Sequence, residues 1–344
     1  MILDNKAIHN YLFQLEQEDK FSGVVLIARN FRIVFSMAYG YSHWGNKVLN
    51  TTNTIFNLGS MGKMFTGVAI VKLAEEGELK FDDRVEKFLP NLLLNEGKIT
   101  IHQLLTHTSG CDTFFNEKYK KYSNRIRTID GFLNLVNDSQ SLFTPGEKFH
   151  YSNTGYLILG AIIEKITGQS FYEYIKKNIF MKANMENTDY YEMDQDVPNL
   201  ANGYTELNQN MTYEQGLKRN NIFMQGLKGS PAGGCYSTLN DLSKFIYSLE
   251  NQVLLNREHT ILTTAGKVII GTNKANNSIR YGYGFFNRNI NGIIHFGHGG
   301  DYPGVHTDLR FYPNEKLLTI VLSNNDIITG KPRVEKYLEE VIFN

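Results

Sequence analysis

The chain has 344 residues, which exceeds the usual size of a single hydrophobic core, so one large two-lobed unit or two domains are expected. Hydrophobic residues make up 42% and charged residues 20%, the composition of an ordinary globular protein. Lysine plus arginine equals aspartate plus glutamate, so the formal net charge is zero. A protein that binds nucleic acid through a basic surface is therefore not expected.

The first 23 residues predict an amphipathic helix. They contain neither a basic start followed by an apolar block nor a small-residue cleavage site, so no secretory signal is predicted. No apolar run approaches the roughly 18 residues that a membrane span needs. A cytoplasmic protein is expected, and an exported chain whose signal has been removed is the alternative.

Cysteine usage favours reduced thiols. Cys111 and Cys235 lie far apart and form no CxxC pair, so buried free thiols are expected rather than a disulfide framework.

Strand patterns occur at both ends of the chain. Two β-rich runs, Gly23–Ala28 and Arg32–Tyr39, flank a short polar break and predict a hairpin. A second hairpin is predicted from strands at Val305–Tyr312 and Leu317–Ser323, joined by a Pro-Asn-Glu turn. An amphipathic helix over Arg333–Ile342 follows it. The two hairpins predict one antiparallel sheet that is assembled from both termini.

The middle of the chain has helical periodicity, interrupted by polar and glycine-containing loops. It predicts a mostly helical lobe over residues 81–225, inserted into an α/β lobe formed by residues 1–80 and 226–344. No internal repeat or proline-rich linker separates the lobes, so residues 1–344 are expected to form a single unit of the α+β class. The interface between the lobes is a natural place for a ligand cleft.

Ser60 and Lys63 stand three positions apart at the start of an apolar-periodic segment. A serine at a helix N-terminus has free backbone N–H groups beside it that can stabilise an oxyanion, and a lysine at i+3 shares its helix face. The pair therefore fits a nucleophile and its activator. The alternative is an N-cap serine followed by a solvent-facing lysine. Neither a phosphate-binding loop nor a G-x-S-x-G elbow is present.

Tyr151 and Asn153 lie in a polar loop before a long predicted helix. A tyrosine there can lean into a cleft, where a nearby ammonium would lower its pKa and make it a general base. Asn153 offers a donor and an acceptor for a substrate amide. The alternative is that Asn153 caps the helix while Tyr151 packs.

His298, Gly299 and Gly300 precede the strand of the last hairpin. Consecutive glycines let a backbone approach a substrate closely, and the next N–H, from Asp301, can face that of Ser60 to complete an oxyanion hole. His298 would then donate to the substrate or to Tyr151. The alternative is a tight turn or a β-bulge.

A metal site is not favoured. His295, His298 and His306 fall close together, but there is no H-E-x-x-H motif and no zinc-finger spacing. His102 and His107, five apart, do not share a helical face and are interpreted as structural. No metal and no cofactor are predicted.

In order, the S-x-x-K, Y-x-N and H-G-G triplets resemble the serine β-lactamase and penicillin-binding-protein superfamily. They are most similar to the branch that holds class C β-lactamases, D-alanyl-D-alanine carboxypeptidases and related esterases. The longer segments ITIHQLLTHTSG, TPGEKFHYSNTGYLILGAIIEKITGQSF, PAGGCYSTLNDLSKF, YGYGFF and GHGGDYPG also look like this branch. The resemblance covers the chain from about Phe21 to Asn324.

The resemblance implies an antiparallel sheet flanked by N- and C-terminal helices, with an inserted mostly helical lobe. It also implies that Ser60 is the acylated nucleophile and Lys63 its activator. Tyr151 would act as general base and then as acid toward the leaving group, and Asn153 would bind the substrate amide.

The third triplet departs from class C β-lactamases. The resemblance implies that His298, Gly299 and Gly300 line the opposite wall and that the N–H groups of Ser60 and Asp301 form the oxyanion hole. Class C enzymes usually have lysine where this chain has His298, and losing that cation should weaken capture of the penicillin carboxylate. Many relatives have glycine, serine or threonine at Asp301, whose carboxylate would repel anionic substrates if it pointed inward.

The expected function is a metal-independent serine hydrolase that works through an acyl-enzyme on Ser60. Its substrate would be a small molecule or short peptide with a peptide, ester or amide bond, of peptidoglycan or β-lactam type among others. A D-alanyl carboxypeptidase or D-peptidase and an esterase lead, and weak β-lactamase activity comes third. The alternative is a slow penicillin-binding or peptidoglycan-fragment-binding scaffold of the same fold.

Overall fold

The computed structural model describes residues 3–92, 98–136, 141–208, 210–272, 277–326 and 332–343. The helices are α1 (Asn5–Gln17), α2 (Lys63–Glu75), α3 (Ile101–Leu105), α4 (Glu117–Tyr122), α5 (Ile129–Leu133), α6 (Asn153–Thr167), α7 (Phe171–Ile175), α8 (Leu239–Glu250), α9 (Arg257–Thr264) and α10 (Val334–Phe343). Within the described ranges, no helix is both long enough and apolar enough to cross a membrane.

The strands fall at the two ends of the chain and in short pairs between them. They are β1 (Gly23–Arg29), β2 (Arg32–Tyr39), β3 (Tyr41–His43), β4 (Val48–Leu49), β5 (Phe56–Asn57), β6 (Tyr204–Thr205), β7 (Arg219–Asn220), β8 (Tyr236–Ser237), β9 (Val268–Thr272), β10 (Ser278–Tyr281), β11 (Phe286–Ile290), β12 (Ile293–Tyr302), β13 (Val305–Tyr312) and β14 (Leu317–Ser323). Both predicted hairpins are confirmed, as is a helix at each end of the chain.

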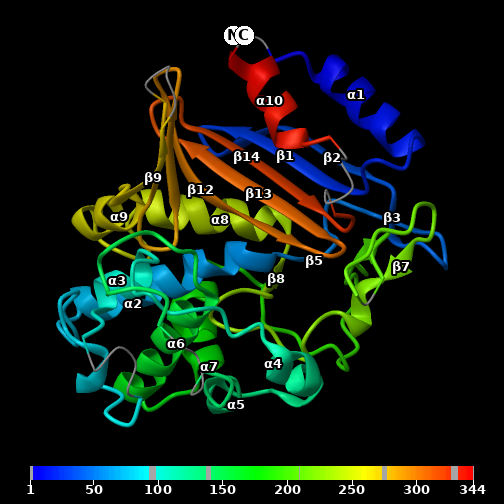
Figure 1. Cartoon of the computed structure of the whole chain (residues 1–344). Coiled ribbons are helices and arrows are strands. Elements are labelled where there is room, and N and C mark those ends of the chain that lie inside the picture. Colours follow the sequence, from blue (N-terminus) through cyan, green and yellow to red (C-terminus); the bar gives the residue numbers. More distant parts are fainter. Residues whose placement is uncertain are drawn as a thin grey trace.

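One antiparallel sheet dominates the described part of the chain, with the strand order β2-β1-β14-β13-β12-β11-β10-β9. Strand β1 pairs with β14 along its whole length, from Gly23 opposite Ser323 to Arg29 opposite Leu317. The expected sheet, assembled from both termini, is therefore present, and Figure 1 shows the two chain ends side by side above it.

The sheet is covered on both faces, which explains its apolar central strands. Helices α1 and α10 lie on one face, here called the outer face, while α2 and α8 lie on the other, the inner face (Figure 1). In β1, Val24 and Leu26 join the inner core whereas Val25 and Ile27 join the outer core. Successive strand residues point to opposite faces, so a strand buried on both sides is a continuous apolar run.

The two predicted lobes share one core. Phe65 of α2 lies between Phe180, from the predicted helical lobe, and Phe245 of α8, with ring centroids 5.0 and 4.9 Å away in T-shaped arrangements. Such edge-to-face packing is favourable for aromatic rings. The division at residues 81 and 225 stays a prediction, but the parts on either side of it pack together.

Both cysteines are buried free thiols, as predicted. Burial raises the pKa of Cys111 to about 11, so this thiol stays protonated and unreactive at neutral pH.

Helix α2 is buried on every side from Lys63 to Val71, and most of these residues are apolar. At Gly67 it packs against the chain just before β11, where an added Cβ would lie 2.2 Å from the Tyr283 carbonyl oxygen. This backbone contact sets the position of α2 along its axis, and with it the position of its first turn.

Replacing Gly67→Ala should lower the free energy of unfolding by about 1–3 kcal/mol, because the new methyl group overlaps a backbone atom. The helix propensity of alanine, worth about 1 kcal/mol, would act in the opposite direction. Urea denaturation measures the change. Gly271→Ala is the control because a Cβ there meets nothing within 4 Å. Equal stability of both variants would contradict the close contact.

Candidate active site

A cavity of about 280 Å³ lies where the beginnings of α2 and α6 meet the end of β12. The predicted site residues divide into two groups around it. Those that line the cavity are Ser60, Tyr151, Asn153 and Asp301. Those outside the lining are Lys63, His298, Gly299 and Gly300. Segments far apart in the sequence thus meet at one cavity.

Ser60 lies in the short 3-10 turn η1 (Gly59–Gly62), directly before α2. Gly59 has φ +53°, in the left-handed region that glycine adopts without a steric cost. Its N–H donates to Asn57 Oδ1 at 2.8 Å, and its carbonyl accepts from the Gly234 N–H at 3.0 Å. The turn that presents the Ser60 hydroxyl is therefore held on both sides.

The Lys63 side chain is fully buried, so the alternative of a solvent-facing lysine is wrong. Its Nζ lies 3.3 Å from Ser60 Oγ, 2.7 Å from Asn153 Oδ1 and 2.5 Å from the Ala232 carbonyl oxygen. The Ala232 carbonyl was not predicted as part of the site. Its segment, PAGG, carried a sequence signal through the family resemblance but no assigned role.

Burial holds the pKa of Lys63 well below its usual value of 10.5. Within the described residues, no carboxylate charge offsets the loss of water around this amine. A neutral amine has two N–H donors and one lone pair. Asn153 Oδ1 and the Ala232 carbonyl accept the two donors, which leaves the lone pair to face the Ser60 hydroxyl. A neutral Lys63 amine in this position is able to accept the proton of the Ser60 hydroxyl.

The predicted lowering of the pKa of Tyr151 is wrong. Complete burial raises this pKa above its usual value of 10, and the smaller opposing effect of the Ser60 hydroxyl does not offset it. The expected cause is missing, because Lys63, 4.7 Å from the ring centroid, is itself held toward its neutral form. Tyr151 is therefore a phenol at neutral pH, suited to donate a proton.

The ring of His107 packs against the ring of Tyr151. Its ring centroid lies 4.2 Å from that of Tyr151, and its Nδ1 accepts the Ser152 N–H at 3.1 Å. Burial holds the pKa of His107 well below its usual value of 6.5, so the ring is neutral and can accept this bond. Its interpretation as a structural histidine agrees with these contacts.

Strand β12 approaches the serine turn so closely that glycine is required. A Cβ on Gly300 would lie 2.1 Å from the Leu58 carbonyl oxygen and 2.8 Å from Ser60 N. Across the same gap, a Cβ on Gly59 would lie 3.6 Å from Asp301 N. The backbone N–H groups of Ser60 and Asp301 thus border the same space, the arrangement expected of an oxyanion hole.

The resemblance implied that His298 lines the wall of the cavity, but His298 lies outside the lining. It is 2% exposed, its Nε2 lies 3.0 Å from the Tyr281 hydroxyl, and its Nδ1 lies 2.6 Å from the Gly299 carbonyl oxygen. Burial lowers its pKa to about 3. His298 is therefore a neutral, buried residue near Tyr151. The residue of this segment that borders the cavity is Asp301.

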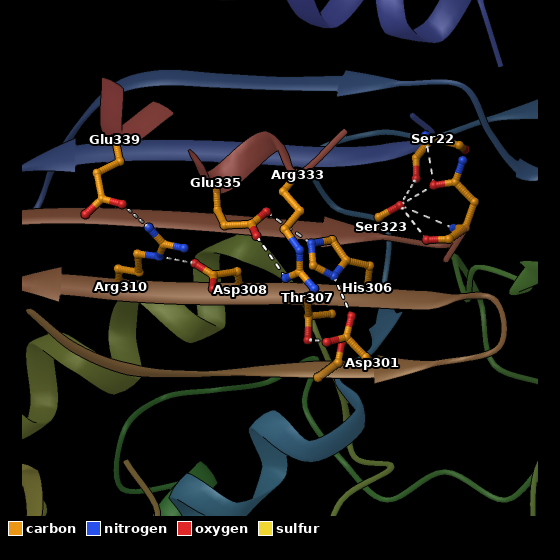
Figure 2. A network of polar contacts seen from close by, with 12 residues as sticks. Ser22, Asp301, His306, Thr307, Asp308, Arg310, Ser323, Arg333, Glu335 and Glu339 are labelled. Carbon is orange, nitrogen blue, oxygen red and sulfur yellow. Dashed lines mark hydrogen bonds and ion pairs between the residues drawn. The ribbon is translucent and has the colours of Figure 1, made fainter. Parts of the chain in front are cut away.

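The Asp301 carboxylate turns away from the cavity. Its neighbour Tyr302 lines the cavity, so strand alternation places the Asp301 side chain on the outer face. There Oδ1 lies 2.7 Å from His306 Nδ1 (Figure 2). The condition under which this carboxylate would repel an anionic substrate is therefore not met.

The three histidines near the C-terminus are divided by the sheet. His298 lies on the inner face, whereas His295 and His306 belong to the outer face beside α10. In the part of the chain that the structure describes, no group of three or more histidine, cysteine, aspartate or glutamate side chains is arranged to hold a metal ion.

Comparison with known proteins decides the family. The family described as Beta-lactamase matches residues 9–340. The chain belongs to this family. Penicillin-binding protein 4* of Bacillus subtilis (strain 168) is 30% identical, over 98% of this chain and 76% of that protein. Protein flp of Staphylococcus aureus (strain NCTC 8325 / PS 47) is 28% identical over 93% of this chain, and the alignment spans 62% of its own length.

A solved structure gives the same result. The penicillin-binding protein from Bacillus halodurans superimposes with a TM-score of 0.86 at 29% identity, covering 99% of this chain and 100% of that one. The resemblance to the serine β-lactamase and penicillin-binding-protein superfamily is thereby confirmed, together with the predicted fold.

Replacing Lys63→Met tests the neutral state of the amine. The pKa of Lys63 is lowered on folding, so at pH values between this lowered pKa and 10.5 the unfolded chain binds a proton that the folded chain lacks. Stability supplied by Lys63 therefore rises with pH toward 10.5. The free energy of unfolding of the wild type, measured in urea at several pH values, should gain on that of the variant over this range. If the difference in free energy of unfolding between the two proteins did not change with pH, the lowered pKa of Lys63 would be contradicted.

Proposed function

We propose that this protein is a serine hydrolase that forms an acyl-enzyme on Ser60 and acts on esters and amides with an uncharged, apolar acyl group. The observation that carries the proposal is the fully buried Lys63 amine, 3.3 Å from Ser60 Oγ and hydrogen-bonded to two other acceptors. A lysine buried for packing alone would not need a serine hydroxyl beside its amine. A serine that acts as a nucleophile does need a neighbouring base.

Acylation follows from the positions of these groups. The Lys63 lone pair takes the Ser60 proton as Oγ attacks the substrate carbonyl carbon, and the N–H groups of Ser60 and Asp301 stabilise the oxyanion. Tyr151, a buried phenol, donates its proton to the leaving group. Lys63 then returns a proton to Tyr151. Water replaces the leaving group in the second half of the cycle and releases the acid.

The cavity wall supports an apolar acyl group. Its aromatic side chains come from the segments around α4 and α5, from one later loop and from strand β8: Phe114, Phe115, Tyr119, Phe132, Tyr191 and Tyr236. Aromatic rings recognise flat or branched apolar groups by area and shape and offer no charge.

The charges around the cavity argue against a substrate carboxylate at this site. Lys228 is the cation in the lining, and its Nζ lies 3.0 Å from Glu192 and over the Tyr172 ring at 4.1 Å. His298 is neutral and buried behind the lining. A carboxypeptidase or an efficient β-lactamase must bind the carboxylate of its substrate, so esters and amides without one are the favoured substrates.

Penicillin binding remains the second candidate because of the relatives. The first of them is named a penicillin-binding protein, and this chain has the serine and lysine that acylation needs. With no unpaired cation in the described lining, acylation by penicillin is expected to be slow.

Labelling with a fluorophosphonate probe tests the nucleophile. The wild type should be labelled on Ser60, Ser60→Ala should not be labelled, and Lys63→Ala should lose labelling by at least about 100-fold because its base is gone. Mass spectrometry locates the adduct, and circular dichroism checks that the variants fold. An unlabelled wild-type protein that also hydrolyses no p-nitrophenyl ester would favour the scaffold alternative.

Shortening the aromatic wall should change substrate preference. Phe115→Ala should reduce kcat/KM for p-nitrophenyl phenylacetate relative to p-nitrophenyl acetate by about tenfold, because an aromatic contact to the larger acyl group is lost. Phe223→Ala is the matched control, since Phe223 is 85% exposed and outside the lining. Nitrocefin should be a poor substrate of all three proteins. An equal preference in wild type and Phe115→Ala would contradict this assignment of the acyl site.

A further inference from the structure

A chain of charged groups crosses the outer face from β12 to α10. Asp301 Oδ1 lies 2.7 Å from His306 Nδ1, and His306 Nε2 lies 3.1 Å from Glu335 Oε2 (Figure 2). His306 and Glu335 are 4% and 3% exposed, so this imidazole is buried between two carboxylates. Each ring nitrogen faces an acceptor that cannot donate, and both can be satisfied only when both carry a proton.

The surroundings favour this imidazolium. Burial alone would lower the pKa of His306, but the hydrogen bonds to Asp301 and Glu335 outweigh it and raise the pKa to about 9. Burial alone would raise the pKa of Glu335, but the hydrogen bond to His306, the charges of His306 and Arg310 and a backbone hydrogen bond together lower it to about 2. Arg333, from the segment just before α10, lies 3.4 Å from the other Glu335 oxygen. From β13, the ion pair of Asp308 and Arg310 also faces the cluster.

The neighbouring residue fixes the same hairpin from the opposite face. Thr307 Oγ1 donates to the Leu58 carbonyl at 2.9 Å, on the inner face, and so ties β13 to the turn of Ser60. His306, one residue earlier, holds Asp301 on the outer face. The β12–β13 hairpin is thus fixed on both sides at the level where Asp301 N borders the oxyanion space.

We propose that His306 is a positioning residue of the oxyanion hole: anchored by Glu335 of α10, it holds the Asp301 side chain and thereby the direction of the Asp301 backbone N–H. The proposal rests on the proposed function in one respect, that this N–H stabilises the oxyanion. The C-terminal helix, which contributes nothing to the cavity lining, thus acts on the reaction through the sheet.

The charge arrangement gives His306 this role rather than a general packing role. Asp301 is 52% exposed, so without the imidazolium its carboxylate would turn toward water and draw the end of β12 with it. Glu335 is buried and would lose its partner at the same time. An uncharged residue at position 306 therefore loosens an oxyanion donor while the nucleophile and its base stay in place.

The test is the kinetics of ester hydrolysis by the full chain. His306→Gln should lower kcat by about 10-fold or more with KM changed less than twofold, because the donor is misdirected in the transition state while the acyl pocket is intact. Glu339→Gln is the matched control: this residue lies one turn further along α10 and pairs with Arg310, so kcat should stay within twofold.

The pH profile separates positioning from general support. The pKa of His306 is raised to about 9, so its contribution is complete below pH 6.5 and lost as the pH rises through 9. In the wild type kcat should fall along a limb near pH 9. Glu335→Gln keeps an acceptor for His306 but removes one charge, and should move this limb to lower pH. His306→Gln should lack the limb.

A double-mutant cycle makes the link to Asp301 explicit. Asp301→Asn should lower kcat, and the pair Asp301→Asn with His306→Gln should cost no more than either change alone, because both break one connection. Additive losses, or an unchanged kcat and limb in His306→Gln and Glu335→Gln, would overturn the proposal. If instead the wild type neither labels on Ser60 nor hydrolyses esters, the proposed function has failed, which is a different outcome.

Discussion

The buried Lys63 amine is the constraint on which the site depends. A lysine side chain that is cut off from water and has no carboxylate beside it must be satisfied by neutral acceptors. Here they come from positions 90 and 169 residues further along the chain, Asn153 of α6 and the Ala232 carbonyl. Moving either segment would leave a polar group unpaired in the core. The requirements of one amine therefore bring three distant segments together around Ser60.

Close backbone contact is the second constraint, and it follows from the first. Once Lys63 fixes the serine turn, the strand β12 and the loop after Ala232 pack against it without side chains between them. A Cβ on Gly300 would overlap the Leu58 carbonyl, and one on Gly233 would lie 2.5 Å from the Gly59 carbonyl. Glycine at these positions lets backbone N–H groups, rather than side chains, border the cavity beside Ser60. Such donors are already oriented before the substrate arrives.

Sequence patterns predicted the features that depend on local chemistry. The hairpins β1–β2 and β13–β14 follow from alternation and turn residues within short windows, and the pairing of Ser60 with Lys63 follows from helix geometry. The order of the three motifs could identify the family because each motif is a short continuous stretch that can be found in the sequence without knowing the fold. The direction of a side chain beside a glycine pair could not be read in this way. It depends on the strand pleat, which sends Asp301 to the outer face.

The ionisation states were the hardest property to predict, because burial depends on the whole chain. An exposed Lys63 would have lowered the pKa of Tyr151, whereas the buried one does not. The neutral state of His298 could not be predicted either, because it depends on burial and on the contact with Tyr281, which no sequence motif indicates. Burial therefore changes the roles in the proposed mechanism: Lys63, expected as the activator of Ser60, serves as the base, and Tyr151 keeps only the acid role of the two expected of it.

Strand alternation finally explains why the two faces of the sheet have different chemistry and still affect one another. The inner face of the β12–β13 hairpin carries Gly300 and Thr307 against the serine turn, whereas the outer face carries Asp301, His306 and Arg310 against α10 (Figure 2). Charges strong enough to distort the cavity are thereby kept one strand thickness away from it. The two faces still meet at Asp301, which lines the cavity while its side chain belongs to the outer network; our proposal for His306 depends on this double position.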